Sequence, residues 1–142
     1  MKIYIAGPFF SEREKKLINI VIDIAKKNWP DAELFIPMEH FIIGGETMPN
    51  SEWAKKVREM DIEAIKECDI ILALYYGHYS DTGTVFEIGY GSALGKEIYI
   101  ANLDTTTSLM VTSSGKNLWL HEENKSLTEF NERQLNLIIN QK

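Results

Sequence analysis

The sequence of 142 residues contains a single cysteine, Cys68, and three histidines that are scattered along the chain. A lone cysteine cannot form an intrachain disulfide, and no histidine or second cysteine stands at metal-ligand spacing from it. We therefore expect no metal site, and we expect Cys68 to be a packed thiol. The sequence also has no Walker A motif and no dinucleotide-binding glycine fingerprint, so no cofactor is predicted.

Long apolar runs and an excess of basic residues are absent too. No apolar run approaches about 18 residues and no charged-then-apolar leader precedes the first strand, which argues against a membrane span and a signal peptide. The formal net charge of −6 disfavours a nucleic-acid polymer as a partner, because phosphate backbones require a basic surface. We expect a cytoplasmic protein whose partners are small molecules.

Runs of β-branched and aromatic residues alternate with segments of helical periodicity. The predicted strands lie near residues 2–6, 33–37, 69–75, 97–101 and 117–120, and the predicted helices near 12–28, 51–67, 84–94 and 128–140. This alternation is typical of a doubly wound, flavodoxin-like α/β fold with a parallel five-stranded sheet flanked by helices. With 44% hydrophobic residues, residues 1–142 have enough apolar material for one domain.

Two carboxylates flank a glycine turn in the segment DTGTVFEIGYGSALGK, residues 81–96. Glu87 is predicted to lie in the first turn of the following helix, where the helix dipole favours an ionised carboxylate that can act as a nucleophile. The alternative is a capping box, in which Glu87 reaches back to the helix N-terminus at Thr84. Asp81, taken alone, is explained equally well as a turn residue before glycine.

A third carboxylate, Asp61, falls within the apolar face of the helix predicted for residues 51–68, for which Ser51 is the expected N-cap. A carboxylate that points inward is costly unless it has a hydrogen-bond partner or a ligand, so Asp61 is a candidate site residue. The alternative is an edge position from which its side chain turns out to solvent.

The N-terminal segment KIYIAGPFFS predicts a strand, a loop at Gly7, and a helix with a capping box between Ser11 and Glu14. In open α/β sheets, the loops that follow the strands form the ligand crevice. Residues 4–10 and 77–87 would therefore line one pocket, onto which the three acids converge. Phe10 and its neighbour could stack on a flat base there, or they could pack against the adjacent loop.

These segments, together with Ser108-Leu-Met110, resemble the nucleoside 2′-deoxyribosyltransferases in order and spacing over nearly the whole chain. The resemblance implies that Glu87 is the nucleophile that attacks the anomeric carbon of deoxyribose. It implies that Asp81 exchanges a proton with the base and that Asp61 holds the nucleophile or the sugar. Tyr4 would orient Glu87.

The resemblance further implies exchange of the base of a 2′-deoxyribonucleoside for a free purine or pyrimidine base, with retention of the β configuration and a role in nucleotide salvage. The expected substrate contacts are Gly7, Phe10, Gly83, Ser108 and Met110. Of these, Ser108 and Met110 would come from a neighbouring subunit of a homo-oligomer, dimer-based and in the family often a hexamer.

Two departures from the family pattern leave alternatives open. Ser108 stands where the family usually has asparagine, and the related 2′-deoxynucleoside 5′-phosphate N-hydrolases use a serine there to bind phosphate. Residues 113–115 could form a small anion-binding loop or an ordinary turn. In the loop at 37–41 the family often has an amide that contacts the base, whereas this chain has Glu39, His40 and Phe41, so base preference stays open. A non-catalytic nucleoside-binding module is a third possibility.

Overall fold

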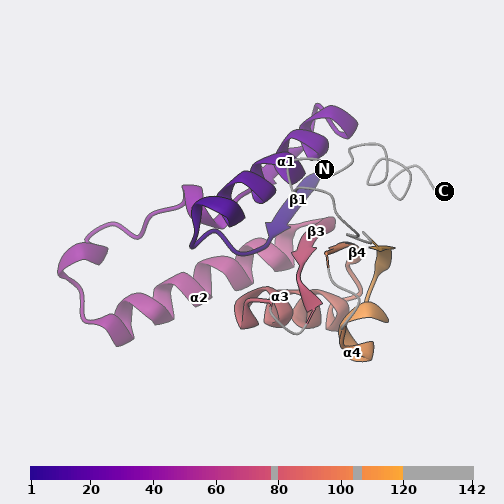
Figure 1. Ribbon diagram of the computed structural model, residues 1–142. Helices are drawn as coiled ribbons and strands as arrows, with labels where there is room; N and C mark the ends of the chain where they lie inside the picture. Colours follow the sequence, from indigo (N-terminus) through magenta and orange to yellow (C-terminus); the bar gives the residue numbers. More distant parts are fainter. Residues whose placement is uncertain (78–79, 104–106, 120–142) are drawn as a thin grey trace.

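The computed structural model describes residues 1–77, 80–103 and 107–119 (Figure 1). Its strands are β1 (Lys2–Ala6), β2 (Glu33–Phe35), β3 (Ile70–Tyr75), β4 (Glu97–Asn102) and β5 (Lys116–Trp119). Its helices are α1 (Glu12–Asn28), α2 (Asn50–Glu67), α3 (Thr82–Ala93) and α4 (Leu109–Thr112), with the short 3-10 helices η1 (Pro37–Glu39) and η2 (Gly45–Thr47). The helix expected near 128–140 lies outside the described residues.

All four strand pairings are parallel, and the strand order is β2-β1-β3-β4-β5. This is the flavodoxin-like order, in which the chain winds outward from β1 in both directions. The predicted fold class is therefore confirmed. No helix in the described part of the chain is long and apolar enough to cross a membrane.

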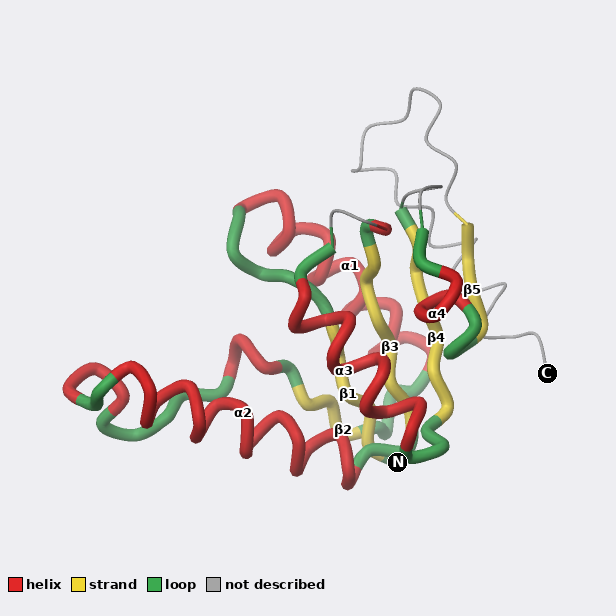
Figure 2. The backbone as a smooth tube through the Cα atoms, turned by 90° about the horizontal axis from the view of Figure 1, so that it is seen from below, coloured by secondary structure: helices red, strands yellow, loops and turns green. Residues whose placement is uncertain are grey.

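The sheet is the middle of three layers (Figure 2). Alternate residues of a strand point to opposite faces, so Ile3 and Ile5 pack with α1 on one side, whereas Tyr4 and Ala6 face the side covered by α3. All six residues of β3 are buried, as expected for a central strand covered on both faces.

The N-terminus of α1 confirms the predicted capping box. The Ser11 hydroxyl accepts from the Glu14 backbone N–H at 3.2 Å, and the Glu14 carboxylate accepts from the Ser11 N–H at 2.7 Å. This reciprocal pair satisfies two backbone donors that a helix N-terminus leaves without intrahelical partners.

The starts of α2 and α3 differ from the predictions. Helix α3 begins at Thr82 with Asp81 as its N-cap, so Glu87 lies in the second turn and no capping box forms between Thr84 and Glu87. Helix α2 begins at Asn50 after Pro49, and Ser51 is not its N-cap. The predictions that Glu87 lies in the first turn and that Ser51 is an N-cap were therefore wrong. The residue at which a helix begins depends on the direction from which the chain enters it, and neighbouring elements determine that direction.

The apolar face predicted for α2 is largely uncovered. Ile65 is the buried residue of this helix, whereas Trp53 remains 45% exposed. Figure 2 shows the N-terminal half of α2 extending away from the sheet. The amphipathic periodicity therefore predicted the helix correctly. The apolar face that it predicted for α2 is mostly not buried within one copy of the chain.

Candidate active site

The centre of the candidate site is a hydrogen bond between β1 and α3. The Tyr4 hydroxyl donates to Glu87 Oε1 at 2.7 Å, and the Tyr4 side chain is fully buried. A buried tyrosine hydroxyl needs a hydrogen-bond partner, and here the partner is a carboxylate. The contact fixes the position of Glu87 relative to the sheet.

The pKa of Glu87 is raised to about 8, mainly by burial; the Tyr4 hydrogen bond lowers it, and the nearby carboxylates Asp61 and Asp81 contribute to raising it. A carboxylate near a helix N-terminus was expected to be ionised. Desolvation of the charged form exceeds the helix-dipole effect here because Glu87 lies in the second turn, and the dipole effect is concentrated in the first.

Asp61 approaches the same site from α2. The predicted alternatives were an inward carboxylate and an edge residue, and the structure shows the inward one: Asp61 Oδ1 is buried and has no hydrogen-bond partner among the described residues. Burial raises its pKa to about 6, and His40 has a lowering effect. A buried oxygen without a partner is costly and is suited to receive a ligand hydroxyl.

Asp81 caps α3 and also lies near Glu87. Its Oδ2 accepts from the backbone N–H of Thr84 at 3.0 Å and from the Thr84 hydroxyl at 3.3 Å. A Cβ placed on Gly83 would lie 2.8 Å from the same oxygen. Gly83 is therefore needed for this cap, which is a role that the substrate-contact prediction did not include.

Three stacked rings extend from Tyr4 towards solvent. Tyr4 and Phe35 stack with centroids 5.4 Å apart, and Phe35 and His40 stack at 4.1 Å with an angle of 8° between their planes. Sequence reasoning missed Phe35 and left His40 aside. The sequence does show an aromatic residue in each of the two predicted strands, Tyr4 and Phe35. It does not show that β1 and β2 are neighbours, which is what places the two rings side by side.

The loop after β1 holds two further predicted residues. A Cβ on Gly7 would lie 2.4 Å from Ile18 Cδ1 and 3.1 Å from Leu74 Cβ, so the glycine permits close approach of α1 and β3. Phe10 is 72% exposed and its ring packs on Phe9, with centroids 5.0 Å apart. The exposed ring is free of the core and is available to a ligand or a second chain.

Ser108 and Met110 lie at the start of α4. The Ser108 backbone N–H donates to the Tyr75 hydroxyl at 3.4 Å, which ties this segment to the end of β3. Met110 is 81% exposed. The structure thus brings Tyr4, Asp61, Asp81 and Glu87 together within one copy, whereas Met110 is exposed on α4.

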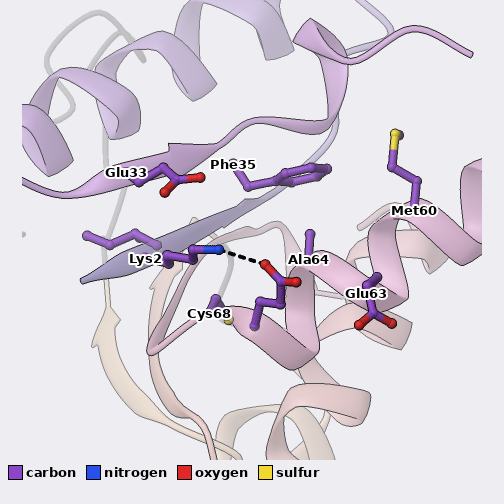
Figure 3. A pocket seen from close by; sticks show the side chains of 9 residues that line it. Lys2, Glu33, Phe35, Met60, Glu63, Ala64 and Cys68 are labelled. Carbon is purple, nitrogen blue, oxygen red and sulfur yellow. Dashed lines mark hydrogen bonds and ion pairs between the residues drawn. The ribbon is translucent and has the colours of Figure 1, made fainter.

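A cavity of about 250 Å³ lies between α2 and the strands β1 and β2 (Figure 3). Phe35 is the residue that this cavity shares with the ring stack, and none of the three acids lines it. Among the described residues, no cluster of three or more histidine, cysteine or carboxylate side chains is arranged to hold a metal ion.

A flavodoxin-like sheet, a buried tyrosine bonded to Glu87, and two further carboxylates near Glu87 define an α/β protein with a cluster of acids at α3. The family model described as nucleoside 2-deoxyribosyltransferase matches residues 3–137. The chain therefore belongs to the nucleoside 2-deoxyribosyltransferase family, which is a family of nucleoside-modifying enzymes, and the resemblance of the sequence segments is confirmed.

Individual relatives agree with this assignment. The nucleoside deoxyribosyltransferase of Lactobacillus leichmannii is 26% identical over 107 residues, which are 69% of this chain and 68% of that protein. A solved 2-deoxyribosyltransferase from Bacillus psychrosaccharolyticus is 27% identical, with a TM-score of 0.67 over 95% of this chain and 96% of the other. A CMP N-glycosidase from Clostridium botulinum is 19% identical, with a TM-score of 0.59 over 98% and 99% of the two chains, which shows a shared fold alone.

Proposed function

We propose that this protein transfers 2′-deoxyribose between nucleobases, exchanging the base of a deoxyribonucleoside for a free purine or pyrimidine base in the course of nucleotide salvage in the cytoplasm. The observation that supports this most is the 2.7 Å hydrogen bond from buried Tyr4 to Glu87, with Asp61 and Asp81 close enough to raise the pKa of Glu87. We take residues 1–142 as one catalytic domain.

In the proposed first step, a Glu87 oxygen attacks the anomeric carbon while the N-glycosidic bond breaks. The bonding electron pair leaves with the base, which takes a proton from Asp81. Positive charge builds up on the sugar in the transition state, and a carboxylate nearby stabilises it and then traps it as an ester. The product of this half-reaction is a covalent deoxyribosyl-Glu87 intermediate and a free base.

In the second step, a nitrogen of the incoming base attacks the same carbon and displaces Glu87, while the base returns a proton to Asp81. Two successive inversions give retention of the β configuration. Asp61, with its unpartnered Oδ1, would hold the sugar or the nucleophile. Attack requires ionised Glu87, and the Tyr4 hydrogen bond favours that form by lowering the pKa of the carboxyl.

The alternative is a 2′-deoxynucleoside 5′-phosphate N-hydrolase, which Ser108 favours. The contacts of residues 113–115 weigh against a phosphate loop there. The hydroxyls of Ser113 and Ser114 donate to the Met110 carbonyl at 3.3 and 2.8 Å, and Asn117 donates to the Gly115 carbonyl at 2.9 Å. The two serine hydroxyls thus donate within the turn that ends α4. This favours the ordinary turn over the anion-binding loop as the interpretation of residues 113–115.

We also propose a dimer-based homo-oligomer with shared active sites. The four most exposed large apolar side chains of the described residues form two pairs: Phe41 and Ile43 in the loop before α2 are 86% and 97% exposed, and Leu109 and Met110 on α4 are 84% and 81% exposed. Exposed apolar groups of this kind typically mark interaction surfaces. A second copy that covers α4 would place Ser108 and Met110 at a neighbouring site.

The proposed function is tested by chromatography of the products formed from deoxyinosine or thymidine, with and without adenine, and from a deoxynucleoside monophosphate. We expect deoxyadenosine to appear only when adenine is present and to be lost in Glu87→Ala. The matched control is Glu52→Ala, which removes an exposed carboxylate of α2 that pairs with Lys56.

Free base released mainly from the monophosphate would replace this proposal by the hydrolase. Ligand binding without turnover, retained in Glu87→Gln, would replace it by a nucleoside-binding module.

A further inference from the structure

Helix α2 carries Asp61 but is held weakly by packing within one copy of the chain. Ile65 is its buried residue, near the C-terminal end, and Trp53 near the other end is 45% exposed. At the packed end, Ile65 and Cys68 belong to the buried core and Ala64 packs against it, but a cavity of about 250 Å³ remains between α2 and the strands β1 and β2 (Figure 3). Close packing normally fixes a helix, so the short packed part of α2 leaves a role for polar contacts in setting its position.

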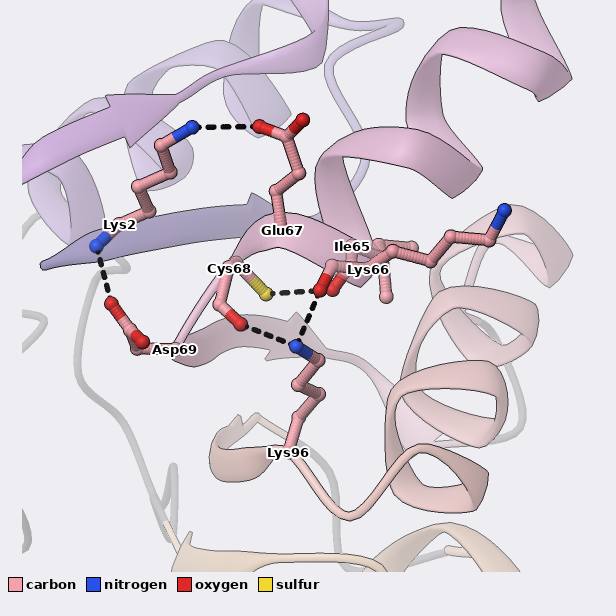
Figure 4. Close-up of polar contacts among 7 residues, drawn as sticks. All are labelled: Lys2, Ile65, Lys66, Glu67, Cys68, Asp69 and Lys96. Carbon is pink, nitrogen blue, oxygen red and sulfur yellow. Dashed lines mark hydrogen bonds and ion pairs between the residues drawn. The ribbon is translucent and has the colours of Figure 1, made fainter.

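Polar contacts concentrate at the C-terminal end of α2 (Figure 4). The Lys96 ammonium donates to the carbonyl oxygens of Lys66 and Cys68, each at 2.6 Å. The last carbonyls of a helix have no intrahelical partners and form the negative end of its dipole, so a cation there binds favourably. Lys96 follows α3 after Gly95, whose φ of 70° turns the chain towards α2.

Lys2 makes a second set of contacts at the same end. Its ammonium pairs with Glu67 at 2.6 Å and its backbone N–H donates to Asp69 at 2.8 Å. The two side chains of the ion pair are 44% and 54% exposed, and ion pairs of this kind contribute little. Lys96, which bridges two carbonyls and contacts Cys68 in a partly buried place, is the stronger tether.

We propose that Lys96 is a positioning residue of the active site, which ties the end of α2 to the end of α3 and thereby keeps Asp61 beside Glu87. Asp61 lies five residues before Lys66, within two turns of the tether, and Glu87 lies on the helix that leads into Lys96. The inference rests on the proposed function, because it assigns Lys96 a role in the same site.

The test compares base-exchange kinetics of Lys96→Met, which retains the length of the side chain without its donors, with Lys96→Arg and Lys66→Met. We expect kcat/KM to fall on the order of 10-fold in Lys96→Met, since small displacements of site groups have effects of this size or larger. Lys96→Arg should restore most of the rate. Lys66→Met, which removes a surface ammonium and keeps the carbonyl, should leave it unchanged.

A double-mutant cycle then separates positioning from general stability. If Lys96 acts through Asp61, Lys96→Met has no further effect in an Asp61→Asn background. An equal loss of kcat/KM in both backgrounds would overturn the proposal.

Hydrogen exchange provides a readout that does not depend on turnover, so it remains decisive if the chain does not exchange bases. Amides of residues 58–67 should exchange faster in Lys96→Met than in Lys66→Met, while those of β1 and β3 keep their protection. Unchanged exchange in α2, or a uniform increase across the sheet, would contradict the tether.

Discussion

At the scale of single residues, the site depends on the hydrogen bond that the Tyr4 hydroxyl donates to the Glu87 carboxylate. Tyr4 is fully buried and Glu87 is partly buried, so the hydrogen bond between them lies in a partly desolvated place. Burial raises the pKa of both groups, and their mutual interaction lowers that of Glu87 while it raises that of Tyr4. The tyrosine therefore remains a donor and shifts Glu87 towards the ionised form.

Tyr4→Phe tests this interaction. Removing the donor removes the lowering effect on the pKa of Glu87, so that pKa should move above about 8. We expect the acid limb of the kcat/KM profile for base exchange to move to higher pH, with a rate at pH 7 lower by about 10-fold and partial recovery at pH 9. Rates of base exchange by both proteins, measured from pH 5 to 9.5, give the two pH profiles. An equal loss of rate at every pH would contradict the role of Tyr4 in lowering the pKa of Glu87.

The raised pKa of Glu87 also has a consequence for stability. The folded state holds the Glu87 proton up to a pKa of about 8, compared with the ordinary value of 4.5 for the unfolded chain. The stabilisation from the protonated group is therefore complete below pH 4.5 and is lost as the pH rises towards 8. We expect Glu87→Gln to be more stable than the wild type at pH 8.5, by about 1–3 kcal/mol.

Urea unfolding of both proteins at pH 5 and pH 8.5 measures this difference. The gain in stability of Glu87→Gln should be smaller at pH 5, where the wild-type carboxyl retains its proton. Parallel pH dependences of the two proteins would show that Glu87 is ionised at neutral pH.

At the scale of elements, two glycines of α3 have opposite surroundings. A Cβ on Gly91 would lie 2.1 Å from Ile71 Cδ1, in the buried contact between α3 and β3, whereas a Cβ on Gly89 would meet nothing within 4 Å. Gly91 therefore permits the close packing that brings α3, and Glu87 on it, down onto the sheet. Gly89 is exposed and has no such role.

We expect Gly91→Ala to destabilise the fold by about 1–2 kcal/mol through overpacking. Gly89→Ala should stabilise it by about 0.5–1 kcal/mol, because alanine is the better helix former. Thermal unfolding of the two variants, which differ by two positions in one helix, measures the contrast. Equal effects would mean that Ile71 moves aside without cost.

At the scale of the whole molecule, the exposed apolar side chains on α4 and before α2 support the proposed oligomer. We expect Met110→Glu to reduce the sedimentation coefficient and to lower base exchange by at least about 10-fold, because a charge is costly in an apolar interface. Asn19→Glu, which adds a charge to an exposed position of α1 across the sheet from α4, should change neither. An unchanged assembly in Met110→Glu would place the interface elsewhere.

The sequence by itself determined the features that depend on local chemistry. The alternation of strand and helix periodicity gave the parallel α/β architecture, and the capping box of Ser11 and Glu14 formed as predicted, because its partners are three residues apart. It also identified Tyr4, Asp61, Asp81 and Glu87 as candidates, through an inward acid, a glycine turn and the family resemblance.

The tertiary structure decided what depends on contacts between distant segments. Tyr4 and Glu87 are 83 residues apart, and the stack of Tyr4, Phe35 and His40 requires β1 and β2 to be adjacent. The raised pKa of Glu87 and the open face of α2 are consequences of burial or its lack, which no local pattern specifies. Desolvation and exposure depend on what packs against a residue, so the ionisation of the site is a property of the folded chain.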